Sequence, residues 1–197
     1  MCSVAAGVDA IGFVFAESVR RISVEHAAHI AAVVPPFVAI VAVFRNPSVD
    51  DIRAVLRIDR LTLMQSDEAD AAIFAKAGCR VSLLPVIRIG ASVPVADSRG
   101  PCLIEGLRSG VGERVDWTQV APIASERSVI LAGGLTPRNV AEAIAAVRPY
   151  GVDVSSGVES EPGIKDPRLI EGFVRAVRWA DSQMEIEDEQ GDDKERA

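Results

Sequence analysis

Short apolar stretches alternate with longer helical ones along this chain. The apolar stretches are almost uninterrupted by polar residues, as strands of a parallel sheet covered on both faces must be. Several of the longer stretches begin with a residue pair typical of a helix N-terminus, such as Thr136-Pro137. The expected strands are residues 10–15, 37–44, 60–65, 79–89, 101–105, 128–132 and 151–156. The expected helices are residues 24–34, 49–58, 68–76, 118–124, 137–147 and 166–179.

Regular alternation of strands and helices over this length predicts a parallel sheet. A closed (β/α)8 barrel and an open doubly wound sheet both fit the alternation. The glycine-rich first turn of a nucleotide-binding unit is missing, which disfavours the open sheet. Barrels often bind phosphate in the loops after their last two strands, and here those loops are LAGGL at 131–135 and VSSG at 154–157. We therefore expect an α/β fold, a (β/α)8 TIM barrel of the phosphate-binding type.

The charge of the chain changes this picture at one end only. A chain of 197 residues is long enough for one domain with a sizeable core. Residues 185–197 hold seven acidic and two basic side chains, and so contribute −5 of the net charge of −7. This end has almost no apolar residue to bury and should be solvated. We expect a barrel domain at 1–180 and an acidic disordered tail at 181–197.

Several partners and locations are disfavoured. No basic stripe is present, so nucleic acid is not an expected partner. Three cysteines without metal spacing favour a reducing compartment, and no signal peptide is visible. Residues 27–44 are apolar, but Pro35 and Pro36 divide them into halves that are each too short to span a membrane. We expect a cytoplasmic protein without a membrane partner.

The loops after the last two expected strands are rich in small residues. One contains Gly133 and Gly134, and the other contains Ser155, Ser156 and Gly157. Small residues let the backbone approach an anion, which free N–H groups then bind without a lysine. Either loop alone is more simply a tight turn, because glycine is the default turn residue. The two together favour a phosphate site.

At this point the sequence resembles the phosphoribosylanthranilate isomerase family. The similarity is strongest in ILAGGLTPRNVAEAIAAVRPYGVDVSSGVESEPGIKDP at 130–167, and is also visible in AGVDAIGFVFAESVRRIS at 6–23 and GVGERVDW at 110–117. It extends over about residues 3–178. The resemblance implies a (β/α)8 barrel enzyme of tryptophan biosynthesis. Its reaction is the Amadori rearrangement of N-(5′-phosphoribosyl)anthranilate to 1-(2-carboxyphenylamino)-1-deoxyribulose 5-phosphate, without metal or organic cofactor.

This reaction needs a phosphate site, a cation for the anthranilate carboxylate, a general acid for the furanose ring oxygen and a general base for the C2′ proton. The resemblance assigns the phosphate to Gly133, Gly134, Ser155, Ser156 and Gly157.

Two further substrate-binding residues are implied by the same motifs. Arg20, in SVRRI, matches an arginine near the anthranilate carboxylate, which a guanidinium can bind through two parallel hydrogen bonds. Asp153 matches an aspartate near the substrate. From the residues alone, Asp153 is equally well an inward-pointing polar residue of the barrel wall.

The proton-transfer residues depart from the family pattern. The family acid is an aspartate on the sixth strand, where this chain has Glu105, and we expect Glu105 to be the catalytic acid. The family base is a cysteine on the first strand, in a K-I-C-G segment that this chain does not match. Cys102 should lie on the opposite strand face from Glu105, because odd spacing separates them. Cys79 begins a strand and Cys2 lies in a helix, so neither is expected at the site.

Seven expected strands are one short of a closed barrel, so the family's first strand is expected to be missing from the chain. Three explanations remain open: a misassigned start codon, a repurposed relative, or a strand supplied by a second copy in a homo-oligomer. Gln65 and Glu113 also replace family residues. The alternative function is therefore a non-catalytic or repurposed barrel that binds a phosphorylated sugar. Isomerisation of a related phosphoribosyl amine is a third hypothesis.

Overall fold

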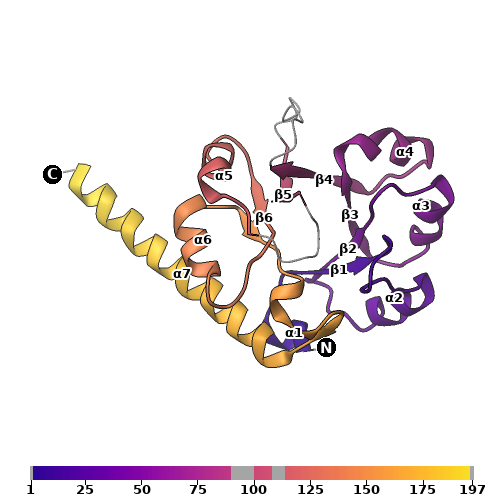
Figure 1. Ribbon diagram of the computed structural model, residues 1–197, viewed down its shortest axis with the longest axis horizontal. Helices are drawn as coiled ribbons and strands as arrows, with labels where there is room; N and C mark the ends of the chain where they lie inside the picture. Colours follow the sequence, from indigo (N-terminus) through magenta and orange to yellow (C-terminus); the bar gives the residue numbers. More distant parts are fainter. Residues whose placement is uncertain (1, 90–99, 108–113, 196–197) are drawn as a thin grey trace.

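The computed structural model describes residues 2–89, 100–107 and 114–195. Its centre is a parallel sheet of seven strands, in which neighbours in the sheet are also neighbours along the chain (Figure 1). Among the described strands, β1 pairs with β2 alone and β7 with β6 alone, so the curved sheet is open between β1 and β7. The strands are β1 (Ala10–Val14), β2 (Ala39–Val43), β3 (Leu61–Asp67), β4 (Ser82–Ile89), β5 (Cys102–Gly106), β6 (Val129–Leu131) and β7 (Gly151–Val152).

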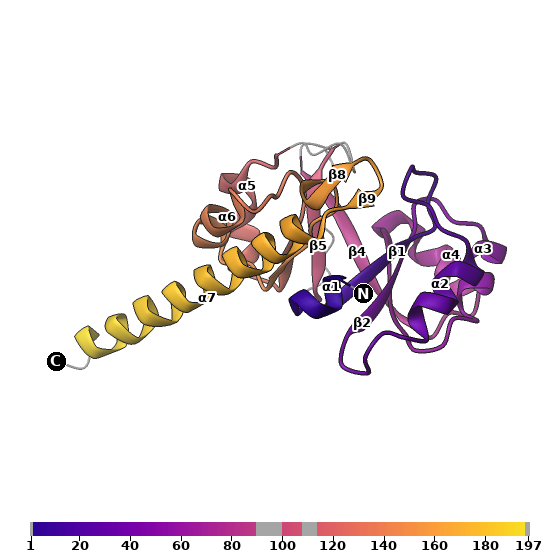
Figure 2. The ribbon, with the colours of Figure 1, turned by 90° about the horizontal axis from the view of Figure 1, so that it is seen from below.

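Helices cover the outer face of this sheet, and Figures 1 and 2 show them in two groups on either side of its centre. Local signals fix where they begin: Ser48 and Asp51 cap α3 reciprocally, each side chain accepting a hydrogen bond from the other residue's backbone N–H. The helices are α1 (Cys2–Ala6), α2 (Val24–Ala31), α3 (Val49–Val55), α4 (Ala71–Lys76), α5 (Trp117–Ala124), α6 (Val140–Val147) and α7 (Pro167–Glu195). Two short 3-10 helices are η1 (Glu68–Asp70) and η2 (Ser156–Val158).

Side chains of each strand alternate between the two faces of the sheet. In β5, Cys102 and Ile104 belong to the apolar core beneath α5 and α6, whereas Leu103 belongs to a separate buried cluster with Leu84 and Val86 of β4. The second cluster fills the concave side of the sheet. The next position of β5 on that side is Glu105, which therefore lies beyond the apolar layer, near the carboxyl end of the strand.

The structure contains all seven expected strands and all six expected helices, and confirms the α/β, TIM-barrel-like fold class. The main differences are at the ends of elements: β4 begins three residues late and β7 is only two residues long. The sequence pattern did not predict a short antiparallel pair, β8 (Glu159–Glu161) and β9 (Ile164–Lys165). This hairpin is polar and its strands are short, so it gives almost no periodic signal.

Helix α1 lies beside the first half of α7, where Arg178 donates a hydrogen bond of 3.3 Å to the carbonyl of Gly7, and the rest of α7 extends away from the sheet (Figure 2). Helix α7 continues beyond residue 181, in the segment for which the sequence predicts a disordered acidic tail. Residues 181–186 are exposed apart from Met184, which packs on the core. The boundary between a barrel domain and a disordered tail remains a prediction.

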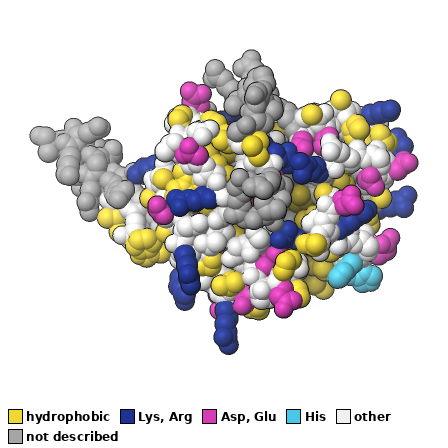
Figure 3. Space-filling view, viewed as in Figure 1, with side chains coloured by type: hydrophobic (Ala, Val, Ile, Leu, Met, Phe, Trp, Pro, Cys, Tyr) yellow, Lys and Arg dark blue, Asp and Glu magenta, His cyan; other side chains and the backbone are white. Residues whose placement is uncertain are grey.

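The surface charges are mixed, and the described helices are not of the membrane-spanning kind. On the face that Figure 3 shows, acidic and basic side chains are interspersed rather than gathered by sign. Among the described helices, none has both the length and the apolar character needed to cross a membrane. The expected absence of a nucleic-acid partner stays a prediction.

Candidate active site

Four charged side chains follow one another across the carboxyl ends of β2 to β5, and we call Arg45, Asp67, Arg88 and Glu105 the charge row. Arg88 and Glu105 are register partners on adjacent strands, and Arg88 Nη2 donates to Glu105 Oε1 at 2.9 Å. Arg88 also donates to Asp67, whose other oxygen lies 3.9 Å from Arg45 Nε. The Arg88 Nε atom is buried and has no hydrogen-bond partner among the described residues. The expected acid, Glu105, is thus held by an arginine that the sequence analysis did not identify.

Asp153 directly follows β7, where its backbone N–H donates to the carbonyl of Leu131 at 2.9 Å. Crowding by protein atoms raises the pKa of the Asp153 carboxyl, and the negative charge of Glu105 raises it further, while Lys165 acts in the opposite direction. Asp153 is nevertheless an exposed residue, so it is crowded by protein on some sides and open to solvent on others. The structure therefore brings the Glu105 carboxylate close enough to Asp153 for its charge to raise the pKa of the Asp153 carboxyl.

The loop after β6 has the backbone conformation that its glycines allow. Gly133 and Gly134 have φ angles of 87° and 65°, in the left-handed region that favours glycine. Asn139 fixes the loop from α6, because its amide donates to the carbonyl of Gly134 at 2.9 Å and accepts from the N–H of Thr136 at 2.7 Å. The loop is thus held in one shape by a side chain from the following helix.

The loop after β7 touches the loop after β6, and we call residues 133–136 and 155–157 together the glycine loops. A Cβ atom added to Gly157 would lie 1.8 Å from the carbonyl oxygen of Leu135, so only glycine fits there. Ser155 and Ser156 lead into η2, and both are partly buried. All five residues expected to bind phosphate are therefore in two adjacent loops at the carboxyl ends of β6 and β7.

Arg20 lies in the loop after β1 and is bound by a residue of the unexpected hairpin. Its Nε and Nη2 atoms donate to the two carboxyl oxygens of Glu159, each at 2.8 Å. Lys165 Nζ donates to Glu159 at 2.9 Å and to the carbonyl of Ser155 at 2.7 Å. The hydrogen bond from Arg20 lowers the pKa of Glu159 to about 2, with smaller contributions from Lys165 and the Gly163 N–H and opposition from burial. Figure 2 shows β8 and β9 at the same edge as the loop that follows β1.

The three cysteines lie away from this arrangement, as the sequence analysis expects. Cys102 is fully buried on the helix side of β5, on the opposite strand face from Glu105. Cys79 precedes β4, at the end of the sheet remote from the site, and Cys2 is exposed in α1. In the described ranges, no group of three or more His, Cys, Asp or Glu side chains could hold a metal ion.

Sequence analysis missed Glu159, Lys165, Asp67 and Arg88. Glu159 and Lys165 flank Pro162-Gly163, a dipeptide typical of a tight turn, and Gly163 has a φ of 86°. That turn could have predicted the hairpin. Nothing in the pattern indicated that Glu159 would meet a residue 139 positions earlier.

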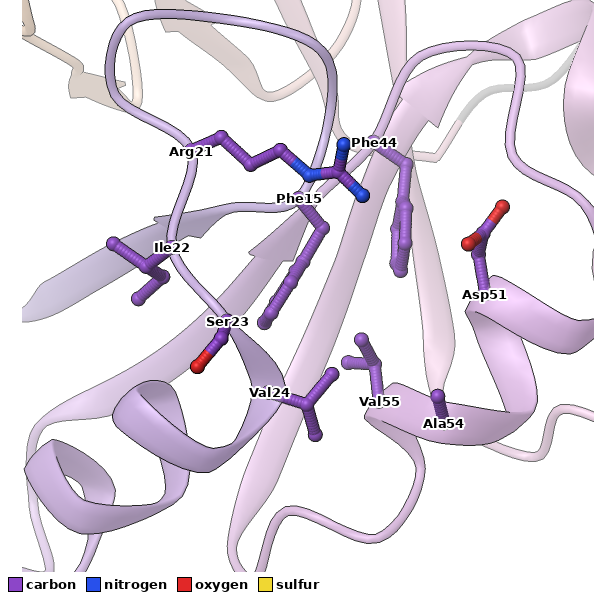
Figure 4. A pocket seen from close by; sticks show the side chains of 9 residues that line it. All are labelled: Phe15, Arg21, Ile22, Ser23, Val24, Phe44, Asp51, Ala54 and Val55. Carbon is purple, nitrogen blue, oxygen red and sulfur yellow. The ribbon is translucent and has the colours of Figure 1, made fainter.

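The structure also contains a hollow of about 460 Å³, lined by residues that follow β1 and β2, by the start of α2 and by α3 from Asp51 to Val55 (Figure 4). Phe15 and Phe44, stacked with ring centroids 5.5 Å apart, form part of its wall. Its charged residues, Arg21 and Asp51, are exposed, and Asp51 already caps α3. None of the expected site residues lines it.

Parallel strands in chain order, helices on their outer face and polar groups at their carboxyl ends define a barrel-type α/β protein, with its candidate site where such folds bind ligands. The chain belongs to the N-(5′-phosphoribosyl)anthranilate isomerase family, whose model matches residues 1–176. A relative of this name from Pseudomonas fluorescens (strain Pf-5) is 42% identical over 93% of this chain and 92% of its own. Another, from Xylella fastidiosa (strain 9a5c), is 39% identical over 90% and 85%.

Solved structures of the family have the same fold. The phosphoribosyl anthranilate isomerase from Thermus thermophilus has a TM-score of 0.79 at 30% identity, over 90% of this chain and 91% of its own. That from Thermotoga maritima has a TM-score of 0.77 at 33% identity, with the same coverage. Glu113 and the rest of the first half of the GVGERVDW segment (110–113), which also carried the resemblance, lie outside the described residues.

Proposed function

We propose that this protein converts N-(5′-phosphoribosyl)anthranilate to 1-(2-carboxyphenylamino)-1-deoxyribulose 5-phosphate. One arrangement carries the proposal: the glycine loops, the Glu105–Asp153 carboxyl pair and the Arg20 guanidinium all lie at the carboxyl edge of one sheet. A substrate with a phosphate, a sugar and a carboxylate has one group for each of these three parts of the site. A solved relative, 33% identical with a TM-score of 0.75, is described as a complex with the reduced form of this product.

The phosphate would bind to backbone N–H groups of the glycine loops. Gly133 and Gly134 turn the first loop without a side chain, and Gly157 lets the second loop lie against it. Lys165 lies beside Ser155 and adds a positive charge near the loop. Such a site binds an anion by backbone donors that are already fixed before the ligand arrives.

Arg20 would bind the anthranilate carboxylate. An arginine has five N–H donors in a planar fork, and Glu159 accepts from Nε and Nη2. Three N–H groups therefore remain available for a second carboxylate. The phosphate and the carboxylate of one substrate would then be held by two different parts of the site.

Glu105 and Asp153 would carry out the proton transfers. In this scheme Glu105 takes up a proton when substrate binds and gives it to the furanose oxygen, the C1′–O bond breaks, and the nitrogen lone pair forms the C1′=N bond. Glu105 then bears a negative charge, which raises the pKa of neighbouring Asp153. This makes Asp153 a stronger base for the C2′ proton, whose removal gives the enolamine that forms the ketone. The sequence offered no base, and the coupled carboxyl pair is the reason to propose Asp153.

A second candidate function is non-catalytic binding of a phosphorylated sugar. The observation that favours it is the placement of the cysteines, because Cys2, Cys79 and Cys102 are all remote from Glu105 and the glycine loops. Backbone donors of the glycine loops would bind phosphate whether or not a base is present. Under this alternative, binding persists and turnover is absent.

The test follows the loss of anthranilate fluorescence as the substrate is converted. We expect measurable turnover by the wild type and a decrease of about 10²–10⁴-fold in Glu105→Ala and in Asp153→Asn, which is the usual contribution of a general acid or base. Cys79→Ala is the control and should retain the wild-type rate. Ribose 5-phosphate should raise the Tm of all four proteins, whereas Gly134→Asp should abolish that rise by adding bulk and negative charge. A stabilised wild type without turnover would support the binding function instead.

Two expectations from the sequence accompany this proposal. We propose a cytoplasmic location, since the substrate is a phosphorylated metabolite and the sequence has three cysteines without metal spacing. We also propose self-association, because the open edges of β1 and β7 are available to a second copy. A relative from Thermotoga maritima is described as dimeric.

A further inference from the structure

Glu159 lies among the proposed substrate-binding groups and is bonded by two cations, Arg20 and Lys165. Its carboxylate accepts four hydrogen bonds: two from Arg20 at 2.8 Å, one from Lys165 at 2.9 Å and one from the Gly163 N–H at 3.2 Å. Its side chain is 4% exposed, and that of Arg20 is 15% exposed. A carboxylate removed from water to this degree is stable only when its oxygens are bonded in this way.

The geometry of the pair restricts how Arg20 can move. Two parallel N–H···O bonds fix both the position and the plane of a guanidinium, which a single bond would leave free to rotate. The described hydrogen bonds of the Arg20 side chain all go to Glu159. Glu159 therefore sets the direction in which the remaining N–H groups of the guanidinium point.

The hairpin connects this pair with the glycine loops. Lys165, on β9, binds Glu159 and also the backbone carbonyl of Ser155. Arg20 and Lys165 together carry one more positive charge than Glu159 neutralises. The excess charge lies between the proposed sites for the carboxylate and the phosphate, where it favours an anionic ligand.

We propose that Glu159 is a positioning residue that holds the Arg20 guanidinium in place for the carboxylate of the substrate aglycone. The inference rests on the proposed function, because it assigns Arg20 to that carboxylate. Glu159 itself contacts no reacting atom in this scheme. It acts through Arg20, and its removal should affect ligands with an aglycone carboxylate and spare those without one.

The experiment compares two ligands by titration calorimetry: the reduced product analogue, which has phosphate and aglycone, and ribose 5-phosphate, which has phosphate alone. We expect Glu159→Gln, which has the same shape without the charge, to weaken binding of the analogue about tenfold or more, as loss of a charge-assisted hydrogen bond does. Its affinity for ribose 5-phosphate should stay within about twofold of the wild-type value, which also verifies folding. Glu161→Gln, exposed on the same hairpin, is the matched control and should bind both ligands normally.

A double-variant cycle separates positioning from general structural damage. In an Arg20→Met background, Glu159→Gln should weaken the analogue no further, because the group that it positions is already gone. Additive losses, or an equal loss for both ligands, would overturn the inference. If Arg20→Met weakens binding of the analogue but Glu159→Gln does not, the inference is also overturned. This result would leave the proposed function standing. If the wild type binds the analogue no more tightly than ribose 5-phosphate, both proposals fail.

Discussion

The glycine loops and the charge row lie at the same edge of the sheet, but backbone forms the first and side chains form the second. The glycine loops depend on backbone: two left-handed glycines, one glycine with no room for a Cβ, and an asparagine that holds the turn. The charge row depends on side chains: Asp67, Arg88 and Glu105 are half-buried and hold one another in place. The first region has its shape before any ligand binds, whereas the second owes its shape to a balance of charges.

This difference determines how each region should tolerate change. A backbone site fails when a single atom is added, since the backbone cannot move aside. A charged site fails when one partner is removed, since the remaining groups are left unpaired at a partly buried position. Changes in one region should also leave the other functional, because the two share no hydrogen bond in the described structure.

The largest effect is expected from Gly157→Ala. The added Cβ would lie 1.8 Å from Leu135 O and 2.9 Å from Leu135 C, and both atoms belong to backbone. We expect a loss of about 3 kcal/mol in the free energy of unfolding, at the upper end for overpacking, and no stabilisation by ribose 5-phosphate. Urea unfolding with and without the ligand measures both.

Gly151→Ala is the matched control for that variant. Its added Cβ would meet only the Ile130 side chain, at 3.9 Å, which is an ordinary contact distance. It should change the free energy of unfolding by less than about 0.5 kcal/mol and retain the ligand effect. Equal behaviour of the two alanine variants would show that the close approach of the glycine loops is not what maintains the site.

The same contrast explains what the sequence could and could not predict. The strands follow from apolar runs, and the glycine loops follow from residue types with one conformational use, so both were identified from sequence. The Arg20–Glu159 pair and the Arg88–Glu105 pair were not, because a charge can pair with many others until the fold brings one of them near. Glu105 was recognised only through the resemblance. The arginine that holds it became visible only when the register of β4 and β5 was known.

An intermediate effect is expected from Arg88→Met, which removes the cation between Asp67 and Glu105. Both carboxylates would then lose the cation that they share. We expect a loss of about 2 kcal/mol in the free energy of unfolding, less than for a fully buried pair because these groups are partly exposed. Binding of ribose 5-phosphate should persist, since the glycine loops are untouched.

Arg45→Met provides the control within the charge row. Arg45 is 51% exposed and lies 3.9 Å from Asp67, so its contribution should be below about 0.5 kcal/mol. Urea unfolding of the two methionine variants distinguishes a row held mainly at Arg88 from one in which all cations contribute equally. The second outcome would contradict the inference that Arg88 is the main cation of the charge row.

The effect that depends most on pH concerns Glu159. Its pKa falls from an ordinary value of 4.5 to about 2 in the folded protein, mainly through the hydrogen bond from Arg20. Because the folded-state pKa is the lower one, the unfolded chain binds a proton first as the pH falls. The stabilisation by Glu159 should therefore be complete above about pH 4.5, decrease below it, and be lost as the pH falls through about 2. Glu159→Gln has no carboxylate to protonate, so the difference in unfolding free energy between it and the wild type should shrink between pH 6 and pH 3, by about 1 kcal/mol or more. Urea unfolding at these two pH values measures that difference, and a difference of the same size at both would show that the charge of Glu159 does not stabilise the hairpin.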